Sequence, residues 1–437
     1  MRRDLGIAVR ARLTWAIAAA SALLVGHGFI LAVDVYSASS RSALASTLEG
    51  REMDPLAGIV RPMLGGLDLA ISIFAPLVAA RVLSIEKERR TFGALCLLQG
   101  GSDRVVVSKL AAALTATALM LVAPAALLAA FRAIGGHVDP IETGIALSGS
   151  ALHLVLVTAV SIAAAAWTQT VAQAAALAVA VSLTSWAIDA ANGFAALAWL
   201  GGASAWSIDR KLDAFERGIV EPGAIAWLVL ASAGAAAIAV LGARFDLSPP
   251  KKTGLAAGMA IVVAAALVAV ASSRRGYDWS EQRRASLPPA VVDRLRDLRQ
   301  PLSIDVLLDR DDSRRAQLEA DFLAKLYLAR PDLVVHTPLD ARAAVVEGWR
   351  DADYGQITVH VGESSRRTRS TSRRELTTLV FEAAGIPPPD WTAPIYPGFP
   401  VVVDGRGRTV LASLAYVVVP CGLLAVGLLL TRRRAIR

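Results

Sequence analysis

The strongest constraint on this chain is a series of apolar blocks, each about as long as a membrane is thick. A helix needs about 20 apolar residues to cross the hydrocarbon core. The chain has 437 residues and is 55% hydrophobic, with its apolar residues gathered into such blocks. Backbone N–H and C=O groups inside a bilayer must pair with each other, so each block is expected to be a helix. A membrane β-barrel would need short alternating strands, and these blocks do not alternate.

We therefore predict an α-helical polytopic membrane protein with about eight transmembrane helices. The expected spans are residues 13–33, 62–82, 110–131, 144–167, 171–188, 223–241, 254–271 and 410–430. Arginines precede the first span, which is longer than the apolar part of a usual signal peptide, so it is expected to be an uncleaved anchor. Cleavage near residues 37–40 is the alternative interpretation.

Charges beside the spans predict the orientation. Lys and Arg gather before the first span, in residues 83–109 and 242–253, and after the last span, whereas loops 34–60 and 132–142 are mainly acidic. The positive-inside rule then places both termini in the cytoplasm, in the cytoplasmic (inner) membrane. The formal charge of +8 is accounted for by these flanks, and the sequence has no nucleic-acid-binding motif, so no nucleic acid partner is expected.

The chain divides into four parts. Residues 1–250 hold six spans, residues 251–273 the seventh, and residues 408–437 the eighth with a basic cytoplasmic tail. Between the last two spans, residues 274–407 read as an extracytoplasmic domain and tether. Strand patterns over 302–308, 333–336 and 356–361, with helical patterns over 313–329 and 374–384, predict a small α/β domain.

The charged segment 84–109 is the most informative part of the sequence. Phe92, Leu95 and Leu98 recur at helical spacing, and Gly100 and Gly101 are expected to end this helix. Glu86 and Glu88 are expected in its first turn, where the helix dipole favours anions. Two interpretations stand: a membrane-surface helix that only anchors its loop, or a docking helix for a cytosolic partner.

This segment resembles the permeases of type-2 ABC transporters, which have an acidic and basic run, Gly-Thr, a leucine-rich helix, a turn and a Lys that opens the next span. The chain departs from that pattern at Arg90, where the family has Gly, and at Gly100–Gly101, where it has Pro. The resemblance implies an ATPase-coupling helix. Its residues are Glu86, Glu88, Arg89, Arg90, Thr91, Phe92, Leu95 and Lys109, with Leu97 in the leucine-rich part.

Two further stretches carry a resemblance. Leu212, Phe215, Gly218 and Ile219 resemble the outer re-entrant segment that precedes the last span of such permeases. Residues 354–361 and the run Arg374-Glu375-Leu376-Thr377 are similar to a strand, turn and helix of gliding-motility-associated ABC auxiliary proteins. A permease followed by a span, an outer domain and a closing span fits that likeness.

The resemblance implies the permease subunit of an ABC transporter, with export as the expected direction. The sequence has no GxxxxGK[ST] loop for ATP phosphates, so ATP hydrolysis is expected in a separate ATP-binding cassette ATPase. This chain would then be no enzyme and bind no cofactor, because ATP and Mg would sit on the partner. A homodimer or heterodimer of permeases is expected, in contact with membrane lipid. The alternative is a membrane-anchored scaffold or sensor whose outer domain binds a partner.

Two polar residues fall inside predicted spans. Asp68 costs about 2.5–3.5 kcal/mol at a helix centre on insertion scales, so it needs a partner, water or a function. Its side chain could reach the headgroups, or it could bond to His153 across helices. Prolines 76, 124 and 420 are interpreted as kinks, with gating hinges as the alternative. The sequence contains no recognisable catalytic group or metal-binding motif.

Overall fold

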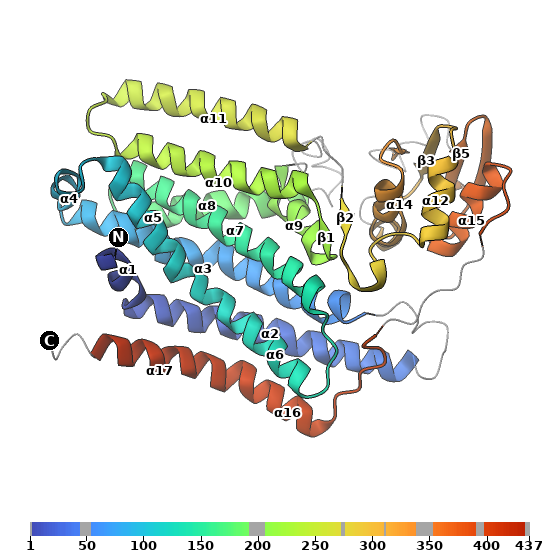
Figure 1. Ribbon diagram of the computed structural model, residues 1–437, viewed down its shortest axis with the longest axis horizontal. Coiled ribbons are helices and arrows are strands. Elements are labelled where there is room, and N and C mark those ends of the chain that lie inside the picture. The colour runs from blue at the N-terminus through green and yellow to red at the C-terminus, as the bar shows by residue number, and fades with distance from the viewer. Residues whose placement is uncertain are drawn as a thin grey trace.

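Long helices make up most of the structure, a computed structural model that describes residues 2–43, 54–191, 206–271, 276–309, 312–337, 353–389 and 397–432. Eight helices in these ranges are long and apolar enough to cross a membrane (Figure 1), which confirms the eight predicted segments. Most extend several residues beyond the predicted ends, because polar residues continue the helix past the apolar block.

The eight segments have the following bounds. The first four are α2 (Arg12–Ala43); a π-helical turn (Leu56–Val60) continued by α3 (Arg61–Glu88); α5 (Ser102–Thr117), a 3-10 turn (Ala118–Leu121) and α6 (Val122–Ala133); and α7 (Pro140–Trp167). The others are α8 (Val171–Ala191); α10 (Pro222–Ala243); α11 (Pro249–Ala271); and α16 (Gly405–Ser413), a π-helical turn (Leu414–Val418) and α17 (Val419–Arg432).

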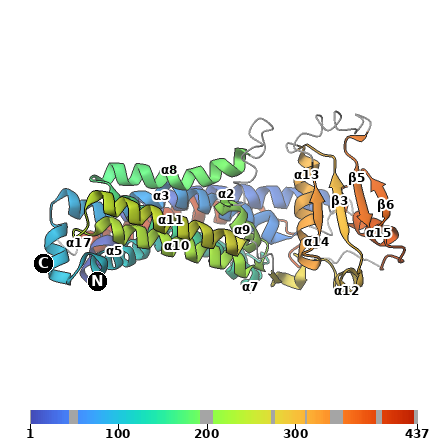
Figure 2. The ribbon, with the colours of Figure 1, turned by 90° about the horizontal axis from the view of Figure 1, so that it is seen from above.

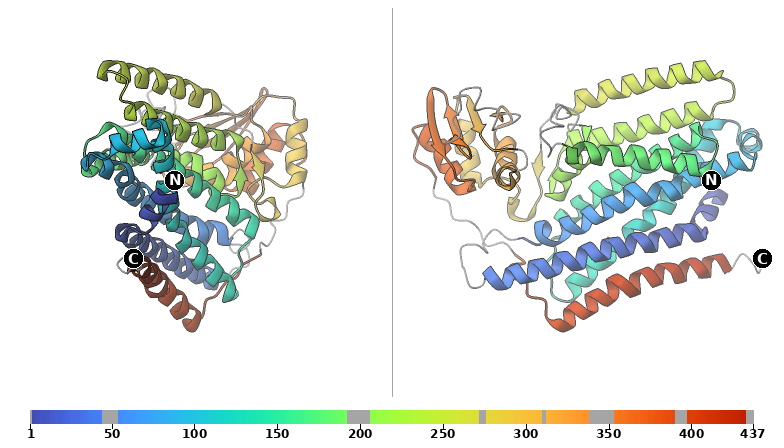
Figure 3. Two further views of the ribbon diagram at one scale, coloured as in Figure 1. Left: turned by 60° about the vertical axis from the view of Figure 1, so that its left-hand side comes forward. Right: turned by 180° about the vertical axis from the view of Figure 1, so that it is seen from behind.

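The centre of the bundle is formed by α3 and α7, which pack on each other, with α2, α5, α8 and α10 around them. Its core includes the fully buried side chains Phe29, Met63, Ile71 and Phe131. By contrast, α11 packs mainly on α10 and α17 on α2. These two helices form opposite edges of the bundle (Figure 3) and expose most of their apolar surface.

Three short helices lie near the ends of the spans. Two of them, α1 (Arg2–Val9) and α4 (Phe92–Gln99), lie at the same end of the bundle as the last turns of α17. The third, α9 (Ile208–Glu216), lies toward the other end, beside α7 and α10. The α/β domain lies beyond this second end (Figures 1 and 2), so α4 and the domain are separated by the length of the spans.

The predicted small α/β domain contains a four-stranded sheet in the order β4-β3-β5-β6. Strand β3 (Leu302–Val306) pairs parallel with β4 (Val334–His336) and antiparallel with β5 (Ile357–Val361), which pairs with β6 (Ser364–Thr368). The helices are α12 (Pro289–Asp297), α13 (Ser313–Leu318), α14 (Ala324–Ala329), joined to α13 by a π-helical turn (Glu319–Leu323), and α15 (Arg373–Ala383). They bury one core with the sheet, centred on Ile304, Phe322, Val359 and Phe381.

Two elements of this domain were not expected from the sequence. Helix α12 begins at Pro289, directly after another proline, and its buried Val291 and Leu295 have the i, i+4 spacing of a helix, so a helical pattern was present that the prediction did not include. The second is β6, an edge strand that carries Arg366 and Arg367 and is exposed along most of its length. An edge strand with no buried face lacks the apolar alternation that identifies strands.

Candidate functional site

A buried lysine joins three helices at the end of the bundle that carries α4. Lys109, on α5, is only 3% exposed. Its Nζ donates to Asp4 Oδ1 on α1 at 2.9 Å and to Glu86 Oε1 on α3 at 2.9 Å. A buried cation is stable only where partners compensate the lost hydration, and two carboxylates do so here.

The same glutamate holds the turn that leads into α4. Thr91 Oγ1 donates to Glu86 Oε2 at 2.5 Å, and the Thr91 backbone N–H donates to the Glu86 carbonyl at 2.9 Å. Thr91 directly precedes Phe92, the first residue of α4. One hydrogen-bonded cluster therefore connects α4 to α3 and α5. It contains three of the residues that the sequence predicted for the coupling helix, Glu86, Thr91 and Lys109.

Backbone geometry at this turn bears on the two departures from the permease pattern. Arg90 has a φ of 57°, in the left-handed region that favours glycine. Arg90, at the position where those permeases have Gly, therefore has a backbone conformation that glycine adopts without strain. At the far end of α4, Gly100 has a φ of 75° and ends the helix, as predicted.

The charged residues before α4 lie in other elements than predicted. The sequence predicted one helix over 84–99 with Glu86 and Glu88 in its first turn, which is wrong: α3 continues to Glu88, and α4 starts at Phe92. Glu88 still lies at a helix N-terminus, but that of α8, where it accepts from the Val171 N–H at 2.7 Å. Lys87 donates to the carbonyls of Ala165 and Ala166 at the end of α7. The exposed Arg89 is the C-cap of α3.

Helix α4 is apolar on both sides. Phe92 and Cys96 face the bundle, and Leu95 is partly buried. The expectation that Leu98 shares this inner face is wrong: Leu98 is 83% exposed, and its neighbour Leu97 is 87% exposed. The reason is local, because the inward positions after Phe92 are Leu95 and Cys96, at the i+3 and i+4 spacing of a helix. Burial raises the pKa of the Cys96 thiol.

A groove of about 820 Å³ lies between α4 and the loop after α10. Its walls include Leu97 and Gly100 from α4 and Arg244, Phe245 and Asp246 from the loop. Phe245 is 66% exposed, with its ring 5.5 Å from that of Phe92. Three large apolar side chains, Leu97, Leu98 and Phe245, are thus exposed around this end of the bundle.

The two polar residues inside the spans are neighbours. His153 Nδ1 lies 2.9 Å from Asp68 Oδ1, so the hydrogen bond suggested by the sequence is present. Ser150 donates to the second carboxylate oxygen at 3.2 Å, and Ser72 lies 3.5 Å from His153 Nε2. His153 is 3% exposed. These contacts give the acid the protein partners that a membrane interior requires.

The outer segment predicted around Leu212, Phe215 and Gly218 forms α9 and the turn after it. Leu212 and Phe215 are buried at 2% and 1% exposure. Phe215 packs so closely on α7 that a Cβ at Gly149 would lie 2.7 Å from the Phe215 Cβ. Gly218 has a φ of 73°, which suits glycine. Residues 192–205, which precede this segment, lie outside the described residues.

On its polar side α9 is tied to α3. Arg61 donates to Asp213 at 2.5 Å and to Glu216 at 2.9 Å. Burial raises the pKa of Glu216 to about 7, outweighing the opposite effect of the Arg61 charge, and the negative charges of Asp68 and Asp213 raise it further.

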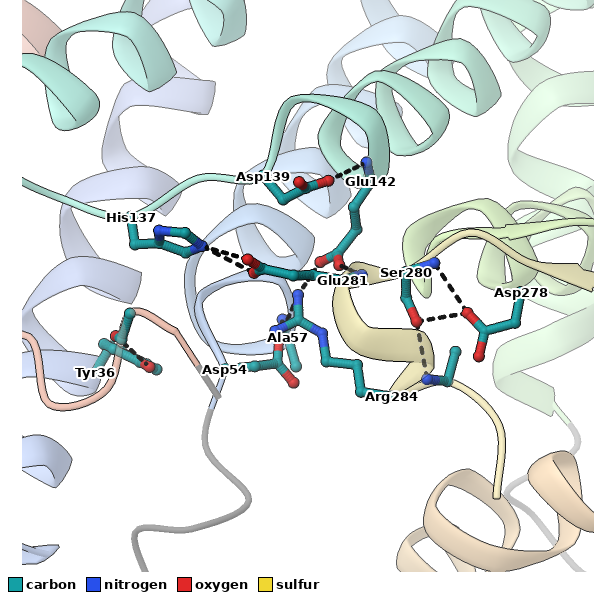
Figure 4. A network of polar contacts seen from close by, with 12 residues as sticks. Tyr36, Asp54, Ala57, His137, Asp139, Glu142, Asp278, Ser280, Glu281 and Arg284 are labelled. Carbon is teal, nitrogen blue, oxygen red and sulfur yellow. Dashed lines mark hydrogen bonds and ion pairs between the residues drawn. The ribbon is translucent and has the colours of Figure 1, made fainter. Parts of the chain in front are cut away.

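A polar junction that was not predicted from the sequence fixes the α/β domain to the bundle (Figure 4). At its centre the Glu142 carboxylate, on α7, bonds to the Arg284 guanidinium and accepts from the Glu281 N–H at 2.6 Å. Arg284 also lies 3.7 Å from Asp54, and His137 lies 2.8 Å from Glu281. Glu142 and Arg284 are 142 residues apart, so no local pattern could have indicated their contact.

Each of the two connections of the domain makes further contacts. Strand β1 (Ile219–Val220), after α9, pairs antiparallel with β2 (Tyr277–Asp278), which leads into the domain. At the other end of the domain, the chain returns along α2, where Tyr36 donates to the Gly398 carbonyl at 3.0 Å and Arg408 pairs with Asp34 at 2.6 Å. Both connections of the domain are therefore bonded to spans.

Within the described ranges, no group of three or more His, Cys, Asp or Glu side chains is arranged to hold a metal ion. Comparison of the chain with protein-family models, curated proteins and solved structures finds no match.

Proposed function

We propose that this protein is the permease subunit of a type-2 ABC transporter, and that α4 is the docking element for a separate ATPase. The observation that carries the proposal is the exposure of Leu97 and Leu98 on a short helix that a buried ion cluster ties to three other helices. The resemblance of residues 86–109 to such permeases supports it.

The exposed leucines favour a protein partner. A helix that is apolar all round is expected to be buried on all sides, yet the bundle covers only the Phe92 and Cys96 side of α4. Contiguous exposed apolar groups rimmed by polar residues are typical of interaction sites. The rim includes the exposed cations Arg89, Arg90 and Arg104, so the partner surface is expected to be apolar at its centre and acidic around it.

The ion cluster gives docking a mechanical consequence. A displacement of α4 would act on Glu86 through Thr91, and on Lys109 and Asp4 through Glu86. Helix α3 then runs the length of the bundle to Arg61, which is bonded to α9 near the α/β domain. ATP-driven closure of the partner can thus bias the spans between two arrangements, provided that the partner binds those arrangements with different affinities.

The proposed topology follows the positive-inside rule. Both termini and α4 lie in the cytoplasm, and the α/β domain lies outside the cytoplasmic membrane. Export is the proposed direction, and two permease subunits, identical or not, would form the membrane unit. ATP and Mg would be bound by the ATPase.

The test is co-purification of the full-length chain from its native membranes, followed by mass spectrometry for proteins with a phosphate-binding loop and by assay of ATP hydrolysis. The wild type should retain an ATPase, and L97D/L98D should lose it. The matched control is V334D, at a 48% exposed position in the α/β domain, which should retain the ATPase. An active ATPase bound equally by L97D/L98D, or absent from the wild type, would overturn the proposal.

The second candidate is a membrane-anchored scaffold or sensor. It is favoured by the bonds that fix both connections of the α/β domain to the spans, because a sensor needs such a link. This role does not need an exposed α4. A domain ligand whose binding alters the spans, with no effect of L97D/L98D, would favour the sensor over the transporter.

A further inference from the structure

A second groove lies inside the spanning region, on the side of the bundle formed by α8, α10 and α11. It has a volume of about 330 Å³. The floor is α7 and α10, and the walls are Val181 from α8 and Val263 and Leu267 from α11. It exists because α8 packs on α3 and α7, whereas α11 packs mainly on α10, so the two helices leave space between them.

The lining of this groove is suited to hydrocarbon. Almost all lining residues are aliphatic or aromatic, and its two hydroxyls are engaged within the protein. Ser182 Oγ donates to the Ala178 carbonyl at 2.9 Å, and Ser185 Oγ accepts from the Ile208 N–H at 2.8 Å. A polar ligand would gain few hydrogen bonds here and would lose its hydration.

One end of the groove has an amphipathic rim. Trp206, 38% exposed, lines the groove near α9, and the buried Trp227 lines it from the start of α10. Tryptophan is enriched where hydrocarbon meets headgroups, since its ring is apolar and its N–H can bond to ester or phosphate oxygens. The rim therefore lies where the headgroup end of a lipid chain would be.

We propose that this groove binds one acyl chain of a bilayer phospholipid. A phospholipid acyl chain is apolar along its length and carries its polar headgroup at one end, which matches an apolar groove with Trp206 at one end. The bound chain fills the space between α8 and α11 and packs on α10. The inference rests on the proposed membrane placement of the spans and not on ATPase docking.

The test uses the full-length chain in nanodiscs that contain a trace of a phosphatidylglycerol with a photoactivatable diazirine on its acyl chain. After illumination, mass spectrometry maps the labelled residues. The expected result is labelling of α8 and α10 at least fivefold above that of α17, which is also exposed to lipid. Filling the groove with A235F from α10 or V181W from α8 should abolish the excess.

The matched control is V262F, on α11 at a 65% exposed position outside the groove, which should leave the labelling unchanged. Equal labelling of α8, α10 and α17 would show only an unspecific lipid shell and overturn the proposal. Labelling that survives both filling variants, or cross-links from V181C to another copy, would also overturn it. Because no ATPase takes part, failure here and failure of the transporter proposal are distinguishable.

Discussion

The buried ion cluster around Lys109 gives the most quantitative prediction. Replacing Lys109 by Met keeps the approximate volume of the side chain but removes the cation to which both carboxylates bond. The side chains of Asp4 and Glu86 are only 9% and 21% exposed. Breaking a buried ion pair by removing one partner costs about 3–5 kcal/mol. We expect the lower end, about 3 kcal/mol, because Glu86 keeps the Thr91 hydroxyl and some contact with solvent.

The assay is equilibrium unfolding of the full-length chain in mixed micelles with an increasing fraction of SDS. K251M is the control, since Lys251 is exposed, and it should change the free energy of unfolding by less than about 0.5 kcal/mol. The triple variant D4N/E86Q/K109M removes all three charges and should recover most of the loss. A loss of less than about 1 kcal/mol for K109M, or a triple variant as unstable as K109M, would refute the reasoning.

Three further predictions concern other parts of the chain. Arg90 has a left-handed φ of 57°, so R90G should raise the free energy of unfolding by up to about 1 kcal/mol. The control R89G, at a residue with a helical φ, should lower the free energy of unfolding. Equal effects of the two substitutions would show that the backbone at Arg90 is not strained. R284A leaves Glu142 buried without its cation and should speed hydrogen exchange in residues 276–286 at least tenfold; unchanged exchange would mean that the junction does not hold the domain. Folding raises the pKa of Glu216 from 4.5 to about 7, so the folded state binds the proton more tightly than the unfolded chain. The free energy of unfolding should therefore fall by up to about 3 kcal/mol between pH 4.5 and 7 and level off at higher pH. E216Q should remove this pH dependence, and a wild type without it would contradict the assignment.

The spans and the main elements of the α/β domain were predictable because their signals are local. An apolar block long enough to span is a helix whatever it packs on, and the alternation in Leu302–Val306 identifies a buried strand. The strand over Ser364–Thr368 was not predictable, because an exposed edge strand is fixed by its hydrogen bonds to β5 and not by its own pattern.

Site contacts between residues far apart in the sequence were also hard to predict. The pairing of Asp68 with His153 could be suggested, since an acid inside a span needs a partner and few polar residues are available. Glu86 and Lys109 were recognised as parts of one sequence motif, but the contact between them was not predicted. The third residue of their ion cluster, Asp4, was not predicted to be part of the site. The junction of Glu142 with Arg284 joins the bundle to a separate domain, and only the tertiary fold brings those residues together.

The orientation of α4 is the claim on which the transporter proposal depends, and cysteine labelling tests it most directly. Cys96 is a poor reporter, because it is buried and its thiol pKa is raised. In a chain with Cys96 and Cys421 replaced by Ser, L97C places a thiol at an 87% exposed position, and S365C places one in the exposed strand β6. With a membrane-impermeant maleimide, intact spheroplasts should label S365C only, and permeabilised cells washed to remove a docked ATPase should label both. Labelling of L97C in intact spheroplasts, or protection of S365C there, would contradict the account.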